Sequence, residues 1–261
     1  MKSISYIPFH KPTIPKEVIT SIKESLDSGW ITTGLKVKQF ENLLSTIVGK
    51  KNIVATSSCT AALHTAYTIA KINKGDEVIV PSFTFCSTIN MLVNMGAVPV
   101  FVDVDENSYC IDPEDIEHRI TNKTKAIVVV HYAGMPADMS KINKIAKKYN
   151  IFVIEDAAHA FSTIYKGKNI GAGKNITCFS FYATKNFTTA EGGAIVCKNL
   201  KQENYARMFI NHGISKNAST RYIQGGSYQY DVVLSGYKYN LSDIHASIGL
   251  CQLHYKKVFE Q

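Results

Sequence analysis

This chain of 261 residues lacks several features that mark common classes of protein. No apolar run approaches the roughly 20 residues of a membrane-spanning helix, and residues 1–15 lack the apolar core of a signal peptide. The six cysteines form no CxxC pair, which favours free thiols over a zinc site or disulfides. No internal repeat or low-complexity linker divides the sequence. We therefore expect one large domain in a reducing cytoplasm, with no membrane partner and no metal.

Two common phosphate-binding motifs are also absent. No GxGxxG follows the first expected strand, so a dinucleotide site has no support. Lys166–Lys174 resembles a P-loop, but its glycine spacing is wrong and Asn175 stands where serine or threonine is required. The 29 basic and 21 acidic side chains give a charge of +8, yet the lysines are scattered, so we expect no nucleic-acid partner. A mildly positive surface suits an anionic cofactor or nucleotide substrate.

The sequence does contain an alternation of apolar runs and helical patterns, which is typical of parallel α/β architecture. Several runs are apolar on both faces, as in Ala126–Val130, and these suit a sheet that is covered by helices on each side. Apolar residues with helical spacing follow Asp138, a candidate N-cap. The expected strands are 52–56, 77–81, 98–104, 125–131, 151–155, 177–181 and 193–197.

Lys185 is the most informative residue of the chain. It follows the apolar and aromatic run 179–182 and precedes the pair Gly192-Gly193, so we expect a buried strand and a close turn on either side. Most lysines lie at the surface, and this is the alternative interpretation. A lysine that is forced toward the interior should have a lowered pKa, and only its neutral amine attacks an aldehyde. Ser180, five residues earlier, could donate to a phosphate.

The segment Val153–His159 is an apolar run that ends in acidic residues. Asp156 is expected at the end of a buried strand, where open α/β sheets bind their ligands. Its carboxylate could pair with a pyridinium, or it could cap a helix. His159 could contact a cofactor ring or its phenolic oxygen, or it could be a packed core residue. A lysine and an aspartate in these positions are the two groups that a pyridoxal phosphate enzyme must supply.

Residues 57–62 are small. They lie between an expected strand and the start of an expected helix. Free backbone N–H groups and the helix dipole at such a point favour a phosphate. Serine and threonine also cap helices in many proteins, so the pattern alone allows either a phosphate site or an ordinary N-cap.

These residues belong to a longer series of motifs that resembles the DegT/DnrJ/EryC1/StrS family of sugar aminotransferases. The resemblance covers nearly the whole chain. Besides the segments around Asp156 and Lys185, its motifs are Ser28–Gly34, Gly75–Ser82, Val100–Asp105, His131–Asp138 and Gly236–Asp243. Within the family, His159 and the HYAG and GYKYN segments look most like the UDP-4-amino-4-deoxy-L-arabinose aminotransferase branch.

The resemblance implies an α/β large domain of the aspartate aminotransferase type (fold type I), with a mostly parallel seven-stranded sheet and helices on both faces. It implies a homodimer with its sites at the subunit interface. Residues 1–240 would form this pyridoxal-phosphate-binding domain with an N-terminal arm. Residues 241–261 would begin a connecting helix to a C-terminal small domain that this chain lacks. We expect a helix over 241–255, with Ile244, Ile248, Cys251 and Tyr255 on one face.

The resemblance also assigns roles to single residues. Lys185 would carry the Schiff base with pyridoxal 5'-phosphate, Asp156 would hold the proton on the pyridine nitrogen, and His159 would assist at the ring. Further cofactor contacts would come from Ser58, Cys59, Thr60, Phe85 and Ser180 and, in the partner subunit's site, from Lys238 and Asn240.

By resemblance the chain is a cytoplasmic aminotransferase. It would transfer the amino group of glutamate to C4 of a UDP- or dTDP-linked keto-deoxy sugar, for cell-surface polysaccharide or lipopolysaccharide synthesis. A same-fold sugar dehydratase is one alternative, but such enzymes typically replace the lysine with histidine, so Lys185 counts against it. A truncated or split-gene remnant that binds cofactor without turnover is the other, and the absent domain keeps it open.

Overall fold

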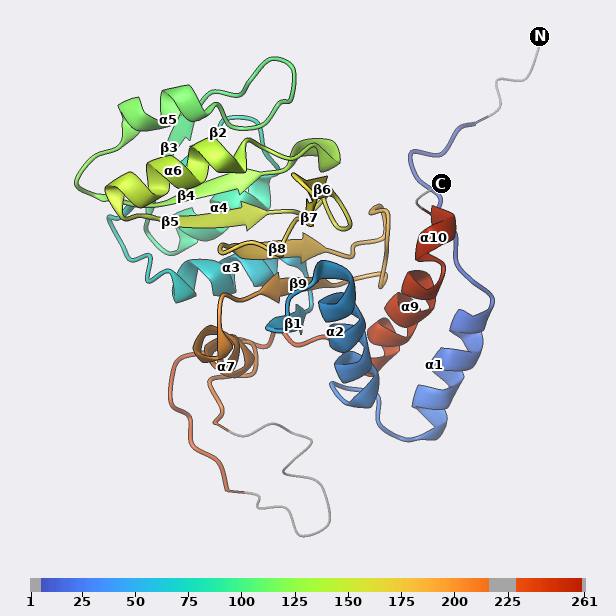
Figure 1. Ribbon diagram of the computed structural model, residues 1–261. Coiled ribbons are helices and arrows are strands. Elements are labelled where there is room, and N and C mark those ends of the chain that lie inside the picture. Colours follow the sequence, from blue (N-terminus) through green and yellow to red (C-terminus); the bar gives the residue numbers. More distant parts are fainter. Residues whose placement is uncertain (1–5, 216–228, 260–261) are drawn as a thin grey trace.

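A computed structural model describes residues 6–215 and 229–259. At its centre is a seven-stranded sheet with the strand order β1-β9-β8-β5-β4-β2-β3 (Figure 1). The strands are β1 (Ile53–Thr56), β2 (Glu77–Pro81), β3 (Val98–Val102), β4 (Thr124–Val130), β5 (Phe152–Asp156), β8 (Ile176–Ser180) and β9 (Gly193–Val196). Among these strands β9 alone runs opposite in direction to the other six. The predicted α/β class and mostly parallel sheet are confirmed.

Every predicted strand is present, with each end displaced by no more than two residues. Side chains of β4 alternate between the faces: Ala126 and Val128 join one core, whereas Ile127 and Val129 join another. All four are fully buried. Burial on both faces explains why such a strand is an unbroken apolar run in the sequence.

Helices cover both faces of the sheet (Figure 1). The core on one face includes residues of α3 (Cys59–Ile69), α4 (Cys86–Asn94) and α7 (Leu200–Phe209). The cores on the other face include residues of α2 (Leu35–Val48), α5 (Pro113–Arg119), α6 (Met139–Tyr149) and α9 (Asp243–His254). The remaining elements are α1 (Glu17–Asp27), η1 (Tyr132–Gly134), the hairpin of β6 (Ile164–Tyr165) and β7 (Lys168–Asn169), and α10 (Lys256–Phe259).

Helix α9 confirms the helix expected near the end of the chain, and it packs against both α1 and α2 (Figure 1). Its buried side differs from the predicted apolar stripe, because Ile244 and Ile248 are only partly buried and Tyr255 is 37% exposed. Small residues allow the close packing instead. A Cβ at Gly249 would lie 2.6 Å from the ring of Phe40 in α2. A helix with neighbours on two sides thus buries small residues rather than a single large apolar stripe.

Asp243, at the start of α9, joins two motifs that lie far apart in the sequence. Its carboxylate accepts hydrogen bonds from the backbone N–H groups of Gly34 (2.8 Å), Lys36 (3.2 Å) and Val37 (3.0 Å). These groups lie at the N-terminus of α2 and have no partner within that helix. The SGWITTG and GYKYNLSD motifs therefore stabilise each other's conformation.

Two structural features are absent from the described ranges. No helix there is long and apolar enough to cross a membrane. No group of three or more His, Cys, Asp and Glu side chains there could hold a metal ion.

Candidate active site

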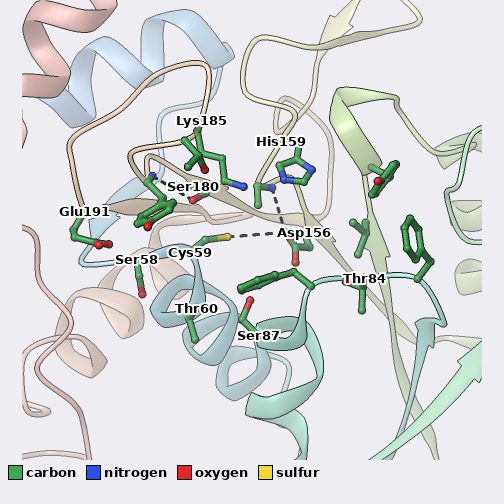
Figure 2. A pocket seen from close by; sticks show the side chains of 18 residues that line it. Ser58, Cys59, Thr60, Thr84, Ser87, Asp156, His159, Ser180, Lys185 and Glu191 are labelled. Atoms are coloured by element: carbon green, nitrogen blue, oxygen red, sulfur yellow. Dashed lines mark hydrogen bonds between the residues drawn. The ribbon is translucent and has the colours of Figure 1, made fainter. Parts of the chain in front are cut away.

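A cavity of about 520 Å³ lies where β4, β5 and β8 end, beside the N-termini of α3 and α4 (Figure 2). This edge is where open α/β sheets bind their ligands. Aromatic side chains form much of its wall: Phe83, Phe85, Tyr132 and Tyr182. Most of the predicted site residues meet here, namely Ser58, Cys59, Thr60, Phe85, Asp156, His159, Ser180 and Lys185.

Lys185 reaches the cavity from the loop that follows β8. Its backbone N–H donates to the carbonyl of Tyr182 at 3.0 Å, which closes a turn in this loop. Partial burial lowers the pKa of the Lys185 amine, and the acidic groups of Cys59 and Asp156 oppose this shift. The direction agrees with the expectation from the sequence. A larger fraction of this amine is therefore neutral and nucleophilic than in an exposed lysine.

The close turn expected at the glycine pair brings the start of β9 against the N-terminus of α3. A Cβ at Gly193 would lie 2.5 Å from the carbonyl carbon of Ser58 and 2.6 Å from the nitrogen of Cys59. A side chain at this position would thus collide with backbone atoms. Only glycine permits this approach, and the approach places the Lys185 loop over the start of α3.

Asp156 is the buried charge of the site and is 4% exposed. Its carboxylate accepts hydrogen bonds from the Thr88 hydroxyl (2.7 Å) and the Ala158 N–H (3.2 Å). Burial raises the pKa of Asp156, while the Thr88 and Ala158 hydrogen bonds oppose the shift. Residues 157–163 form turns rather than a helix, so the helix-cap interpretation does not apply. A buried carboxylate with neutral donors is suited to a positively charged partner such as a protonated ring nitrogen.

His159 lies at the cavity rather than in the core. Its Nδ1 accepts a hydrogen bond from the Ala133 N–H at 3.2 Å. Burial lowers the pKa of His159, the positive charge of Lys185 adds to the shift, and Asp156 opposes it. The imidazole is therefore expected to be neutral, with its proton on Nε2 and available for donation.

The turn at Ser58 is an N-cap, and its position at the cavity also leaves the phosphate-site interpretation open. The Ser58 side chain accepts a hydrogen bond from the Ala61 N–H at 3.1 Å and so caps α3. The same turn lines the cavity together with Thr60 and Ser180. An anion at this point would meet the positive end of the helix dipole and two further hydroxyl groups.

Two predicted site residues do not line this cavity. The amine of Lys238 lies 3.5 Å from the side-chain oxygen of Asn211, and the amide of Asn240 donates to the hydroxyl of Thr33. Both belong to the segment that precedes α9. Their expected contact with the partner subunit's phosphate site stays a prediction.

Sequence reasoning missed several residues of the site. Thr88 lies behind the cavity wall and matters most, because it donates to Asp156 and accepts from the Thr84 hydroxyl at 2.9 Å. The four-residue spacing of these two threonines around the start of α4 was the available signal. Tyr132 and Glu191 line the cavity, and both lie within motifs of the family resemblance, which assigned them no role.

Known proteins resemble this chain over most of its length. A model of the DegT/DnrJ/EryC1/StrS aminotransferase family matches residues 12–260. The uncharacterized protein MJ1066 of Methanocaldococcus jannaschii is 47% identical over 249 residues, which are 95% of this chain and 64% of that protein. The chain thus spans slightly less than two thirds of the length of this curated relative.

Solved structures show the same fold. The proposed sugar aminotransferase Spr1654 from Streptococcus pneumoniae, in its PMP-form, is 36% identical with a TM-score of 0.89, covering 97% of this chain and 68% of its own. Helicobacter pylori PseC, an aminotransferase involved in the biosynthesis of pseudoaminic acid, is 31% identical with a TM-score of 0.88. The match covers 96% of this chain and 66% of the PseC chain. The predicted aminotransferase fold is confirmed. By these matches, the chain belongs to the DegT/DnrJ/EryC1/StrS aminotransferase family.

Proposed function

We propose that this chain carries the catalytic residues of a pyridoxal-phosphate-dependent aminotransferase, which moves the amino group of glutamate to a UDP- or dTDP-linked keto-deoxy sugar. One observation carries the proposal. Lys185, with a lowered pKa, and Asp156, a buried carboxylate, converge on one cavity (Figure 2). Family membership supports the transfer of an amino group. The PLP- and PMP-forms of Spr1654 support the cofactor.

The residues of the cavity fit pyridoxal phosphate. Phe85 offers an aromatic face to a flat ring, and Asp156 offers a negative partner to the ring nitrogen. Ser58 and Ser180 lie with the N-terminus of α3 at an anion-binding position. Lys185 supplies the amine that joins an aldehyde.

The chemistry follows from these positions. When bound, the cofactor supplies an aldehyde that takes up an amino group and a ring that withdraws electrons from the reacting carbon. Asp156 would hold the proton on the ring nitrogen. Lys185 would hold the cofactor through its amine, and the same amine, when free, would take the proton from the α-carbon of glutamate. His159, with its proton on Nε2, can donate to an oxygen at the ring.

Finer features belong to the same proposal. The resemblance of His159 and of the HYAG and GYKYN segments to the UDP-linked pentose branch supports C4 as the aminated carbon, with a product for cell-surface polysaccharide or lipid synthesis. We also propose a homodimer, and a division into a large domain (1–240) and the start of a connecting helix (241–261). The presence of Lys185 disfavours the dehydratase alternative.

The test separates the two half-reactions. Purified protein loaded with pyridoxal phosphate is mixed with glutamate, and oxoglutarate is measured. A UDP-linked 4-keto-pentose or a dTDP-linked 4-keto-6-deoxy sugar is then added, and the aminated sugar is sought by mass spectrometry. Oxoglutarate followed by an aminated sugar supports the proposal. Absence of oxoglutarate would refute the use of glutamate as donor, and oxoglutarate without either aminated sugar would refute the acceptor.

A further inference from the structure

A second cavity, of about 630 Å³, reaches Lys185 from the side of the N-terminal segment. It shares Thr184, Lys185 and His159 with the first cavity. Its own lining includes His10, Thr163 and Asn186. Lys185 and His159 therefore stand at the boundary between two spaces, one beside the β-strand ends and one beside the N-terminal segment.

The two cavities differ in chemistry. The wall of the first is mostly apolar and includes four aromatic rings, whereas polar and apolar groups share the wall of the second about equally. Two of these polar groups are fixed in place. The Thr163 hydroxyl donates to the carbonyl of Gly134 at 3.1 Å, and the Asn186 amide donates to the carbonyl of Phe161 at 3.2 Å. A wall of fixed polar groups suits a ligand with many hydroxyl groups rather than a flat aromatic ring.

His10 supplies a second, independent observation. Its Nε2 is buried and has no hydrogen-bond partner in the described structure. A buried polar atom of this kind is costly unless a ligand or water completes its hydrogen bonding. The segment is also anchored, because the Gln252 amide donates to the carbonyl of Thr13 at 2.6 Å. His10 is thus held beside the cavity with an open hydrogen-bonding position.

We propose that His10 is a specificity-determining residue for the acceptor, and that its Nε2 forms a hydrogen bond with one hydroxyl of the acceptor's ring in the second cavity. The inference rests on the proposed function, because that function supplies a sugar as acceptor. The carbon that receives the amino group must lie within reach of Lys185. A ring in the second cavity meets this condition and leaves the first cavity to the cofactor.

The contribution of His10 depends on one ring hydroxyl of the acceptor. Without His10, an analogue that lacks this hydroxyl should bind as before. The acceptor loses one hydrogen bond, which corresponds to about tenfold weaker binding. His10 should therefore discriminate among acceptors by the position of one ring hydroxyl.

The experiment measures binding without turnover. Lys185→Ala protein is titrated calorimetrically with a UDP-linked 4-keto-pentose and with its 2-deoxy and 3-deoxy analogues. One deoxy analogue is expected to bind about tenfold more weakly than the parent sugar. Adding His10→Leu should weaken the parent about tenfold and abolish the preference for that hydroxyl. His10→Gln has an amide that can reach the same hydroxyl. It should restore part of the affinity for the parent sugar and part of the hydroxyl preference.

Lys11→Ala is the matched control, because Lys11 is the exposed neighbour of His10 and should leave every dissociation constant unchanged. Thermal unfolding of each variant checks that the fold is retained. An undiminished hydroxyl preference in His10→Leu, or no hydroxyl preference with His10 present, would overturn this inference alone. Failure of every nucleotide sugar to bind would overturn the proposed acceptor and this inference together.

Discussion

At the scale of single residues, burial moves the pKa values of Lys185 and Asp156 in opposite directions and favours the neutral form of each. For Asp156 the folded-state pKa lies above the unfolded value. Its ionisation therefore reduces the stability of the fold as the pH rises through the folded-state pKa. A cation placed beside the carboxylate would reverse this effect. The site is thus destabilised without a positive partner and stabilised with one.

Asp156→Asn should separate these two effects. At neutral pH the variant without cofactor should melt no lower than the wild type, because the amide avoids the cost of a buried charge. The charge-assisted hydrogen bond to the ring nitrogen, about 1.5–3 kcal/mol, is lost. Turnover should fall far more than cofactor affinity, because the ring's electron withdrawal depends on that proton. Thermal melts with and without pyridoxal phosphate and single-turnover kinetics measure both. A near-normal glutamate half-reaction would contradict the assigned function of Asp156.

The pKa of Lys185 gives a pH dependence. The pKa lies below the ordinary value of 10.5, so the neutral amine persists to lower pH than in an exposed lysine. The rate constant for cofactor attachment should therefore fall as the pH decreases through a midpoint below 10.5. Stopped-flow absorbance over a pH series measures this midpoint, and Lys185→Ala should show no such transition. A midpoint at or above that of a free lysine would mean that the amine is solvated.

The chemically unusual residues were predictable from sequence, and those whose function depends on tertiary contacts were not. A lysine after an aromatic run and an aspartate at the end of an apolar run stand out locally. Thr88 and His10 are ordinary residues in ordinary surroundings. Their importance appears only when the fold places one against Asp156 and the other against the second cavity.

At the scale of elements, the contact between the start of β9 and the N-terminus of α3 positions the Lys185 loop. Gly193→Ala places a Cβ about 2.5 Å from backbone atoms of Ser58, and neither element can yield without moving the site. We expect about 1–3 kcal/mol of destabilisation and weaker cofactor binding. Urea unfolding and cofactor titration measure these.

Gly173→Ala is the matched control, because a Cβ there meets no atom within 4 Å. It should leave both stability and affinity close to those of the wild type. Equal effects of the two substitutions would show that the contact at Gly193 does not position the site.

Strand positions were predictable because two-sided burial leaves unbroken apolar runs. The antiparallel direction of β9 was not, since an apolar run carries no information about strand direction. The buried side of α9 was also missed. A helix between two others buries small residues such as Gly249, which do not form a conspicuous apolar stripe in the sequence.

At the scale of the whole molecule, the proposed homodimer places Lys238 of one subunit at the site of the other. If so, Lys185→Ala and Lys238→Ala inactivate different halves of one composite site. Mixed dimers would regain one intact site of the two. With random assortment, about half of the dimers contain one subunit of each variant. Because each such dimer has one intact site of its two, about a quarter of wild-type activity should return.

The mixing experiment uses the two inactive variants, unfolded and refolded together, with glutamate turnover as the readout. Each variant refolded alone serves as the control and should stay inactive. Activity that does not rise above these controls would place Lys238 outside the partner subunit's site.

The assignment of Lys185 is the central claim, and reduction with borohydride tests it most directly. Purified protein is incubated with pyridoxal phosphate, reduced, digested and examined by mass spectrometry. We expect the phosphopyridoxyl mass on Lys185 at near-stoichiometric yield, with no comparable labelling of other lysines. Labelling spread over surface lysines, with Lys185 unmodified, would contradict the proposed function at its foundation.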